Sequence, residues 1–219
     1  MNGTQVFSKS ATHELECPEC GHKQNMRLWD SVDGAEDFLL KSQIFDKTLH
    51  LFQCGKCPFN AWVEKELLYY DVRSRFMIYY LPEFEEDTLE LDVSGFFAQE
   101  NNPGFYLRIV TELEELVEKI RIFEDGLDDR AVELLKKSFL NNWYEHYPDR
   151  NVVLRYTQMA RDDRRIKIHV FEPERNDVIA LEFDFAQGYE KAMSMLSKAS
   201  LLKKDICFLK VNQENVLPG

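Results

Sequence analysis

Two short stretches decide the fold, CPECG at residues 17–21 and CGKCP at residues 54–58. Each holds two cysteines separated by two residues, and a turn of that length lets both sulfur atoms face one point. Four thiolates match the tetrahedral preference of Zn²⁺, and paired C-x-x-C motifs are the common pattern of a structural zinc ribbon. The sequence therefore predicts one zinc ion, bound by Cys17, Cys20, Cys54 and Cys57.

Other uses of the cysteines fit the sequence less well. Residues 1–10 are polar and lack the apolar core of a secretory signal, so we expect a cytoplasmic, reducing location in which disulfides rarely persist. A thioredoxin-like redox site would need one C-x-x-C at a strand-to-helix junction. His22 and His50 are alternative zinc ligands, although four thiolates already fill a tetrahedral shell. Cys207 has no C-x-x-C partner, and we expect it to be a small buried apolar residue outside the metal site.

The second cysteine motif differs from the first in the residue that follows its last thiol. Gly21 stands at this place in the first motif and can adopt the positive φ that closes such a turn. Pro58 stands at the same place in the second motif, and proline cannot adopt that conformation. We therefore expect the second turn to differ, or the metal site to be slightly distorted, with all four thiolates retained.

Composition limits the class of protein. The chain has 219 residues, of which 44% are hydrophobic, enough for one large domain or two small ones with a real core. It has no run of about 18 apolar residues, so we expect that it does not span a membrane. The formal net charge of -12 opposes nucleic acid as a partner, although it does not exclude a local basic patch. The sequence does not indicate an oligomeric state.

The N-terminal part is predicted to place strands on both sides of each cysteine pair. These strands are expected at residues 13–17, 22–32, 48–53 and 59–63, with a further strand at 75–81. A short helix is predicted between them at residues 34–45, with Phe38, Leu39 and Phe45 pointing inward. Together these elements predict a zinc-ribbon-like β domain with an inserted helix.

This part of the chain resembles the CpXC domain family of bacteria and archaea. The residues that carry the resemblance are CPECGH at 17–22, LWDSV at 28–32, Cys54 and Cys57, LLYYD at 67–71 and FMIYYLP at 76–82. The stretch from 108 to 129 extends the resemblance to roughly residues 12–145. Because two cysteine motifs define the family, the resemblance implies a bound metal and a fold rather than an activity.

An acidic stretch and a helical hairpin follow. Residues 83–92 hold six carboxylates without the ordered spacing of a calcium loop, so we expect a solvated loop. Thr111 and Glu114 then form a capping box ahead of apolar residues at helical spacing. Gly126 suits the end of this helix and Asp128 the N-cap of a second one, which Pro148 stops.

Alternation replaces helical spacing after Pro148. Strands are predicted at residues 152–159, 165–171, 178–185 and 207–211, with an amphipathic helix at 187–200 that buries Tyr189, Met193 and Leu196. The predicted fold class is therefore α+β: the zinc-ribbon-like domain, the helical hairpin, and a small antiparallel sheet with a covering helix. We place the domain boundary between residues 1–147 and 148–219.

The sequence contains no G-x-S-x-G, H-E-x-x-H or P-loop pattern, so we name no catalytic residue. The leading hypothesis is a non-enzymatic zinc-ribbon protein whose surfaces contact another macromolecule, which we expect to be a protein. The second is a nucleic-acid binder that uses basic clusters at 161–165 and 203–204 beside Phe171, Phe183 and Phe185. The third is an enzyme with a site between the hairpin and the C-terminal module.

Overall fold

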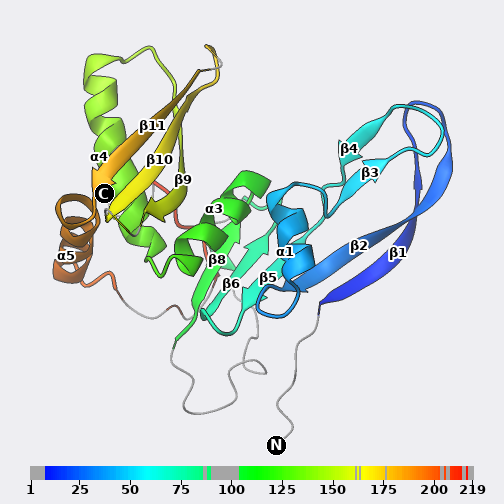
Figure 1. Cartoon of the computed structure of the whole chain (residues 1–219), viewed down its shortest axis with the longest axis horizontal. Helices are drawn as coiled ribbons and strands as arrows, with labels where there is room; N and C mark the ends of the chain where they lie inside the picture. The colour runs from blue at the N-terminus through cyan, green and yellow to red at the C-terminus, as the bar shows by residue number, and fades with distance from the viewer. Residues whose placement is uncertain are drawn as a thin grey trace, which may run out of the picture. The chain divides into compact units, whose positions relative to one another are not determined.

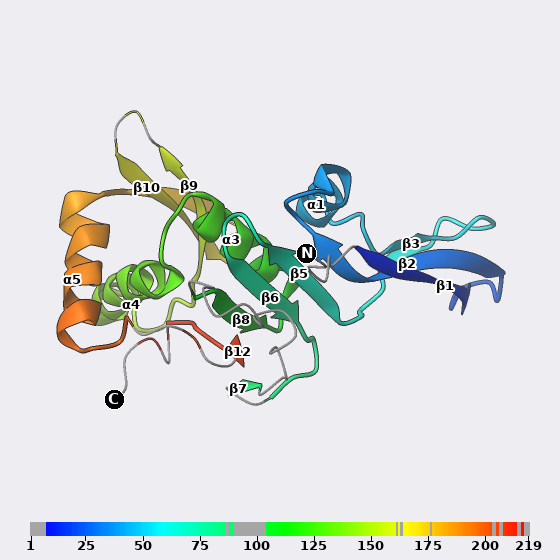
Figure 2. The same cartoon turned by 90° about the horizontal axis from the view of Figure 1, so that it is seen from below.

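The chain folds as two compact units, which are described one at a time. The computed structural model describes residues 8–85, 88–89, 104–160, 162, 164–175, 177–202, 205, 208–213 and 216. Unit 1 comprises Met1–Leu113 and Asp205–Leu209, and unit 2 comprises Glu114–Lys204 and Lys210–Gly219. Figures 1 and 2 show the helices and strands of both units.

A seven-stranded mixed sheet forms most of unit 1. Its strands lie in the order β1 (Lys9–Glu16), β2 (Lys23–Asp33), β5 (Leu67–Asp71), β6 (Phe76–Tyr80), β8 (Tyr106–Val110), β12 (Phe208–Leu209) and β7 (Thr88–Leu89). Neighbouring strands are antiparallel in the pairs β1–β2, β5–β6 and β12–β7. They are parallel in the pairs β2–β5, β6–β8 and β8–β12. This sheet supplies the larger β part of an α+β fold.

The middle strands of this sheet carry buried side chains on both faces. Leu67, Tyr69, Tyr70 and Ile78 are all at most 1% exposed. Strands covered on both faces become nearly continuous apolar runs instead of alternating ones. The sequence predicts β6 from its content of β-forming residues. No alternation of apolar and polar residues marks β5 or β8, so the sequence does not predict these two strands.

A second hairpin and one helix complete unit 1. These elements are α1 (Phe38–Phe45), β3 (Leu51–Gln53) and β4 (Asn60–Trp62). β3 and β4 pair antiparallel as a separate two-stranded sheet. Figure 1 shows this hairpin beside the outer end of the β1–β2 hairpin, so that the two hairpin turns lie close together.

Helix α1 buries other residues than the sequence predicts. Leu40 and Ile44, four residues apart, are buried, whereas Phe38 is 62% exposed and Leu39 is 72% exposed. Phe45 is half-buried. The prediction that Phe38 and Leu39 point inward is wrong, because a helix of two turns buries one narrow i, i+4 stripe and leaves its other positions in water.

Unit 2 combines the predicted helical hairpin with the predicted antiparallel sheet. Its elements are α3 (Leu113–Glu124), α4 (Asp129–His146), β9 (Val153–Ala160), β10 (Arg165–Glu172), β11 (Asp177–Asp184), the π-helix η1 (Ala186–Glu190) and α5 (Lys191–Lys198). Gly126 ends the first helix with a φ of 73°, and the Asp128 side chain caps α4 by accepting the N–H of Arg130. Both predicted helix signals are confirmed. No helix in the described part of the chain is long and apolar enough to cross a membrane.

The helices and the sheet of unit 2 share one apolar core. Val132 and Leu135 of α4 belong to the same buried cluster as Ile166 and Ile168 of β10, and Leu196 of α5 joins it. The packed units therefore do not divide at the predicted boundary between residues 147 and 148. The sequence places the helical hairpin in the N-terminal part, because strand alternation replaces helical spacing only after Pro148. In the structure, the later strands cover the apolar stripe of the hairpin.

The last strand, β12, also lies elsewhere than expected. It pairs with β8 in the sheet of unit 1 and not with the three strands of unit 2. Asp205 precedes it, and its Oδ2 accepts the N–H of Leu107 at 3.1 Å and lies 2.6 Å from Nη1 of Arg108. Both partners of this ion pair are at most 3% exposed. The larger segment of unit 2, Glu114–Lys204, is thus inserted between two segments of unit 1.

Unit 2 also buries a network of five charged side chains. Lys119 Nζ lies 2.9 Å from Asp129 and 2.9 Å from Glu133. Lys136 Nζ lies 2.7 Å from Glu118 and 3.1 Å from Glu133. Each of these side chains is at most 4% exposed. Charged residues on helices usually face water, so the sequence does not predict this network.

Candidate metal centre

The first cysteine turn, residues 17–22, joins β1 to β2. It is closed by two backbone hydrogen bonds of 2.9 Å, from the Cys17 N–H to the His22 carbonyl and from the Gly21 N–H to the Cys17 carbonyl. Gly21 has a φ of 68°, as the sequence predicts. The N–H of His22 donates to the Cys20 sulfur. The turn therefore directs both thiols to one side and supplies one backbone N–H to the Cys20 sulfur.

The second cysteine turn, residues 54–59, joins β3 to β4 in a related way. The Cys54 N–H donates to the Phe59 carbonyl at 3.0 Å, and the Phe59 N–H donates to the Cys57 sulfur. Pro58 takes the place of Gly21 and has no N–H, so the second closing bond of the first turn has no counterpart here. The prediction of a different second turn is confirmed, and the difference is one hydrogen bond.

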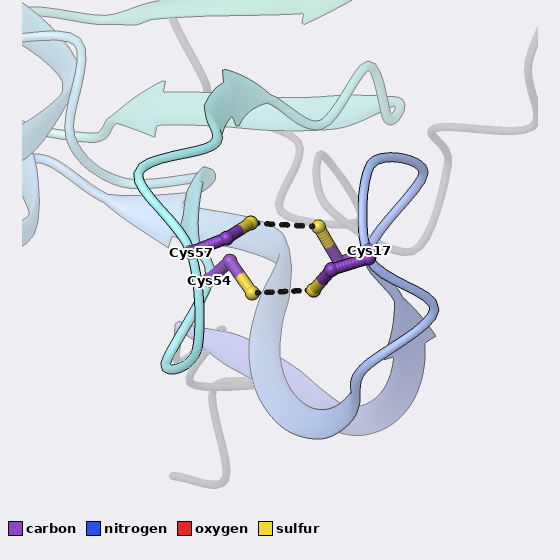
Figure 3. A group of neighbouring side chains, drawn as sticks. Cys17, Cys54 and Cys57 are labelled. Atoms are coloured by element: carbon purple, nitrogen blue, oxygen red, sulfur yellow. Dashed lines mark hydrogen bonds between the residues drawn. The ribbon is translucent and has the colours of Figure 1, made fainter.

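The two turns bring four thiols together from hairpins far apart in sequence. The four Sγ atoms of Cys17, Cys20, Cys54 and Cys57 all lie within 4.8 Å of one another. Cys17 and Cys57 have their Sγ atoms 3.6 Å apart, as do Cys20 and Cys54. Figure 3 shows the side chain of Cys17 facing those of Cys54 and Cys57. All four are free cysteines. Four sulfur atoms about 2.3 Å from a tetrahedral metal lie about 3.8 Å apart, so the cluster is compatible with a bound metal ion.

The surroundings of the Cys54 and Cys57 thiols shift their pKa values in opposite directions. The N–H of Lys56, 3.4 Å from the Cys54 sulfur, lowers the pKa of Cys54 to about 6, and the N–H of Cys57 acts in the same direction. The N–H of Phe59 also lowers the pKa of Cys57, but burial and the neighbouring thiols outweigh it and raise that pKa. Like charges so close together oppose each other, whereas a metal cation stabilises all of them.

Gln24 holds the second turn against the first hairpin. Its Nε2 donates to the Gln53 carbonyl at 2.7 Å, and its Oε1 accepts the N–H of Gly55 at 2.8 Å. These two backbone groups flank Cys54 on either side. Sequence reasoning missed Gln24, because a glutamine on a strand gives no sign of partners about 30 residues away in the chain. Gln24 is therefore a positioning residue of the centre.

The other candidate ligands lie outside the cluster. In the described part of the chain, the group that could hold a metal contains the four cysteines and no histidine. His50 is fully buried, and its Nε2 accepts the N–H of Trp29 at 3.0 Å. Burial lowers the pKa of His50 to about 4, with the charge of Lys65 acting in the same direction. Cys207 and four of the six carboxylates at residues 83–92 fall outside the described residues.

The aromatic residues of the nucleic-acid hypothesis do not share one open surface. Phe183 and Phe185 pack against the core of unit 2, whereas Phe171 lies on the other face of β10, between the buried Val170 and Glu172. The cation of Arg165 lies 3.0 Å from Glu182. Residues 161, 163, 203 and 204 of the basic clusters fall outside the described residues. The described part of the sheet thus offers paired charges and a single aromatic ring on its open face.

Comparison with known proteins supports the same cysteine motifs. The family model described as CpXC protein matches residues 15–136, more than half of the chain and all four clustered cysteines. No curated protein and no solved structure matches the chain. The match ends within α4, so the three-stranded sheet of unit 2 lies beyond it. With its two cysteine turns and a match of this length, the chain belongs to the CpXC protein family.

Proposed function

We propose that Cys17, Cys20, Cys54 and Cys57 hold one structural Zn²⁺, and that the resulting zinc ribbon presents surfaces to a protein partner. The observation that carries the metal is the convergence of four sulfur atoms within 4.8 Å. Backbone N–H groups of both turns point at sulfur, which favours thiolates. Thiolates in a tetrahedral set favour zinc over the harder divalent cations.

The donor set favours a structural metal over a catalytic one. A catalytic zinc keeps a position open for water or substrate, whereas four thiolates fill the shell. The β3–β4 hairpin has only three residues in each strand, and an isolated hairpin is marginally stable in water at best. When bound, zinc supplies a crosslink that fixes this hairpin to β1–β2. The cysteines and Gln24 thus take over the stabilisation that short strands cannot provide.

Elemental analysis of the purified chain tests the metal. We expect one zinc per chain, and we expect Cys17→Ser and Cys57→Ser to lose zinc and to melt at a lower temperature. Cys207→Ser is the matched control and is expected to keep both its zinc and its melting temperature. The proposal fails if the parent chain, purified under reducing conditions, holds no metal, or if the two cluster variants keep full zinc.

The charge and surface of the chain support a protein partner over a nucleic acid. The formal net charge of -12 repels polyanions at long range. Phe38 and Leu39 expose apolar side chains side by side on α1, the kind of surface that protein partners cover. Four free thiols suit a reducing compartment, so we also propose a cytoplasmic location.

Two measurements separate the kinds of partner. Affinity capture with the zinc-loaded chain, compared with Cys57→Ser, is expected to retain a protein only in the zinc-loaded sample. Anisotropy titrations with duplex and single-stranded nucleic acid near physiological salt are expected to show weak binding. A Kd below about 1 μM for nucleic acid at that salt would mean tighter binding than typical non-specific binding. Such a result would favour a nucleic acid over a protein as the partner.

A further inference from the structure

Unit 1 contains a cavity that is separate from the cysteine cluster. Its volume is about 510 Å³, and it is lined by Glu64, Lys65, Glu66, Tyr79, Leu81, Pro82, Glu83 and Phe84. Pockets of about 300–1,000 Å³ are the usual size for sites that take small ligands or side chains. The lining comes from the β4–β5 connection, the end of β6 and the turn that follows it.

The apolar wall of this cavity is built on the core of unit 1. Leu81 donates its N–H to the Val110 carbonyl of β8 at 2.9 Å, and Phe84 donates its N–H to the Leu81 carbonyl at 3.1 Å. The Phe84 side chain packs against the buried cluster that contains Leu81 and Met77. The wall is therefore held in place without a ligand, and it offers an aromatic ring and aliphatic carbon atoms to an occupant.

The charged side of the cavity is acidic. Glu64, Glu66 and Glu83 are all exposed to solvent at its rim. Lys65 is the one cation of the lining, and its Nζ lies 2.5 Å from Asp30. Tyr79 donates its hydroxyl to Glu66 at 3.3 Å, while no cation of the described residues lies within ion-pair distance of Glu64 or Glu83. The cavity thus has carboxylates available for a positive group.

We propose that this cavity receives an arginine side chain of the protein partner, together with an apolar residue next to it. The aliphatic stem of arginine suits the wall of Leu81, Pro82 and Phe84. Its planar guanidinium can stack on an aromatic ring and donate two parallel hydrogen bonds to a carboxylate, which the more strongly hydrated lysine ammonium cannot do. The inference rests on the proposed function for the existence of a protein partner, but its geometry is independent of the metal.

The test titrates the ¹⁵N-labelled chain with the capped peptide GSLRSG and with its GSLQSG counterpart. We expect saturable chemical-shift changes in residues 64–66 and 79–84 with the arginine peptide, and none with the glutamine peptide. The variant Glu64→Gln/Glu66→Gln/Glu83→Gln is expected to weaken binding by about tenfold or more, because charge-assisted hydrogen bonds are lost. The amide oxygen introduced at position 66 can still accept from Tyr79, so the fold is retained.

The control is Glu14→Gln/Glu145→Gln/Glu174→Gln, which removes the same charge from three exposed sites elsewhere. It is expected to bind the arginine peptide within about twofold of the parent, since distant exposed charges are largely screened. Equal losses in the two triple variants, shifts spread over the whole acidic surface, or equal binding of the glutamine peptide would each overturn the inference. The zinc content is measured in the same samples. A chain without zinc contradicts the proposed function, whereas the result of the peptide titration supports or contradicts only the proposal for the cavity.

Discussion

Gln24 is expected to set how tightly the cysteine cluster holds zinc. Its side chain makes hydrogen bonds of 2.7 Å and 2.8 Å to the backbone on both sides of Cys54. Both bonds are open to water, so each is expected to contribute about 0.5–1 kcal/mol, the low end for neutral hydrogen bonds. Gln24→Leu removes both and should weaken zinc binding by about 1–2 kcal/mol, which is roughly a 5- to 30-fold increase in Kd.

Competition with a chromophoric chelator of known zinc affinity, at neutral pH and under reducing conditions, measures this Kd. Asn25→Leu is the matched control, because Asn25 is the exposed neighbour on the same strand and is expected to leave the Kd unchanged. Far-UV circular dichroism of the zinc-loaded variants checks that the fold is kept. The reasoning is refuted if Gln24→Leu binds zinc as tightly as the parent chain, or if Asn25→Leu loses as much affinity.

Four other substitutions test the packing, the buried charges and the buried histidine. Gly34→Ala should destabilise unit 1 by about 1–3 kcal/mol in urea unfolding, because the added Cβ would lie 1.9 Å from the Tyr69 hydroxyl oxygen. Tyr69→Phe should not rescue it, since the ring carbon Cζ would still lie 2.3 Å away; full rescue would contradict the packing. Lys136→Met should cost about 3–5 kcal/mol at neutral pH by leaving buried carboxylates without their cation, and the loss should shrink in acid, where carboxylates are protonated. Because burial lowers the pKa of His50 from 6.5 to about 4, the free energy of unfolding should fall as the pH drops through that range. His50→Gln, unfolded in urea over the same range, should lack this part of the pH dependence.

The cluster of four cysteines was predictable because each pair is a local pattern in the sequence. A pair of cysteines two residues apart fixes a turn by its own spacing. Pro58 cannot adopt the positive φ of Gly21, which predicted that the second turn differs from the first. Gln24 was not predictable, because its partners are brought to it by the pairing of separate hairpins. The sequence therefore predicts the four cysteines of the cluster, but not the residue that holds one of their turns in place.

The fold was predictable where one face of an element meets water. Ile166, Ile168 and Val170 alternate with exposed or half-buried neighbours, and β10 was found where they predict it. The strands buried on both faces have no such contrast. The bounds of the compact units were not predictable for a related reason: helical spacing shows that α4 has an apolar face but not which later strands cover it.

The return of the chain to unit 1 has a consequence for the order of events during synthesis. Arg108 leaves the ribosome long before Asp205, which lies 97 residues later and follows most of unit 2. Residues 114–204 of unit 2 can therefore begin to pack while the sheet of unit 1 still lacks β12, and Val216 joins their core after β12 has been made. The sheet of unit 1 is therefore complete only after translation has passed residue 209. A chain that stops earlier keeps an open sheet edge at β8, which promotes aggregation and which cellular quality control can act on.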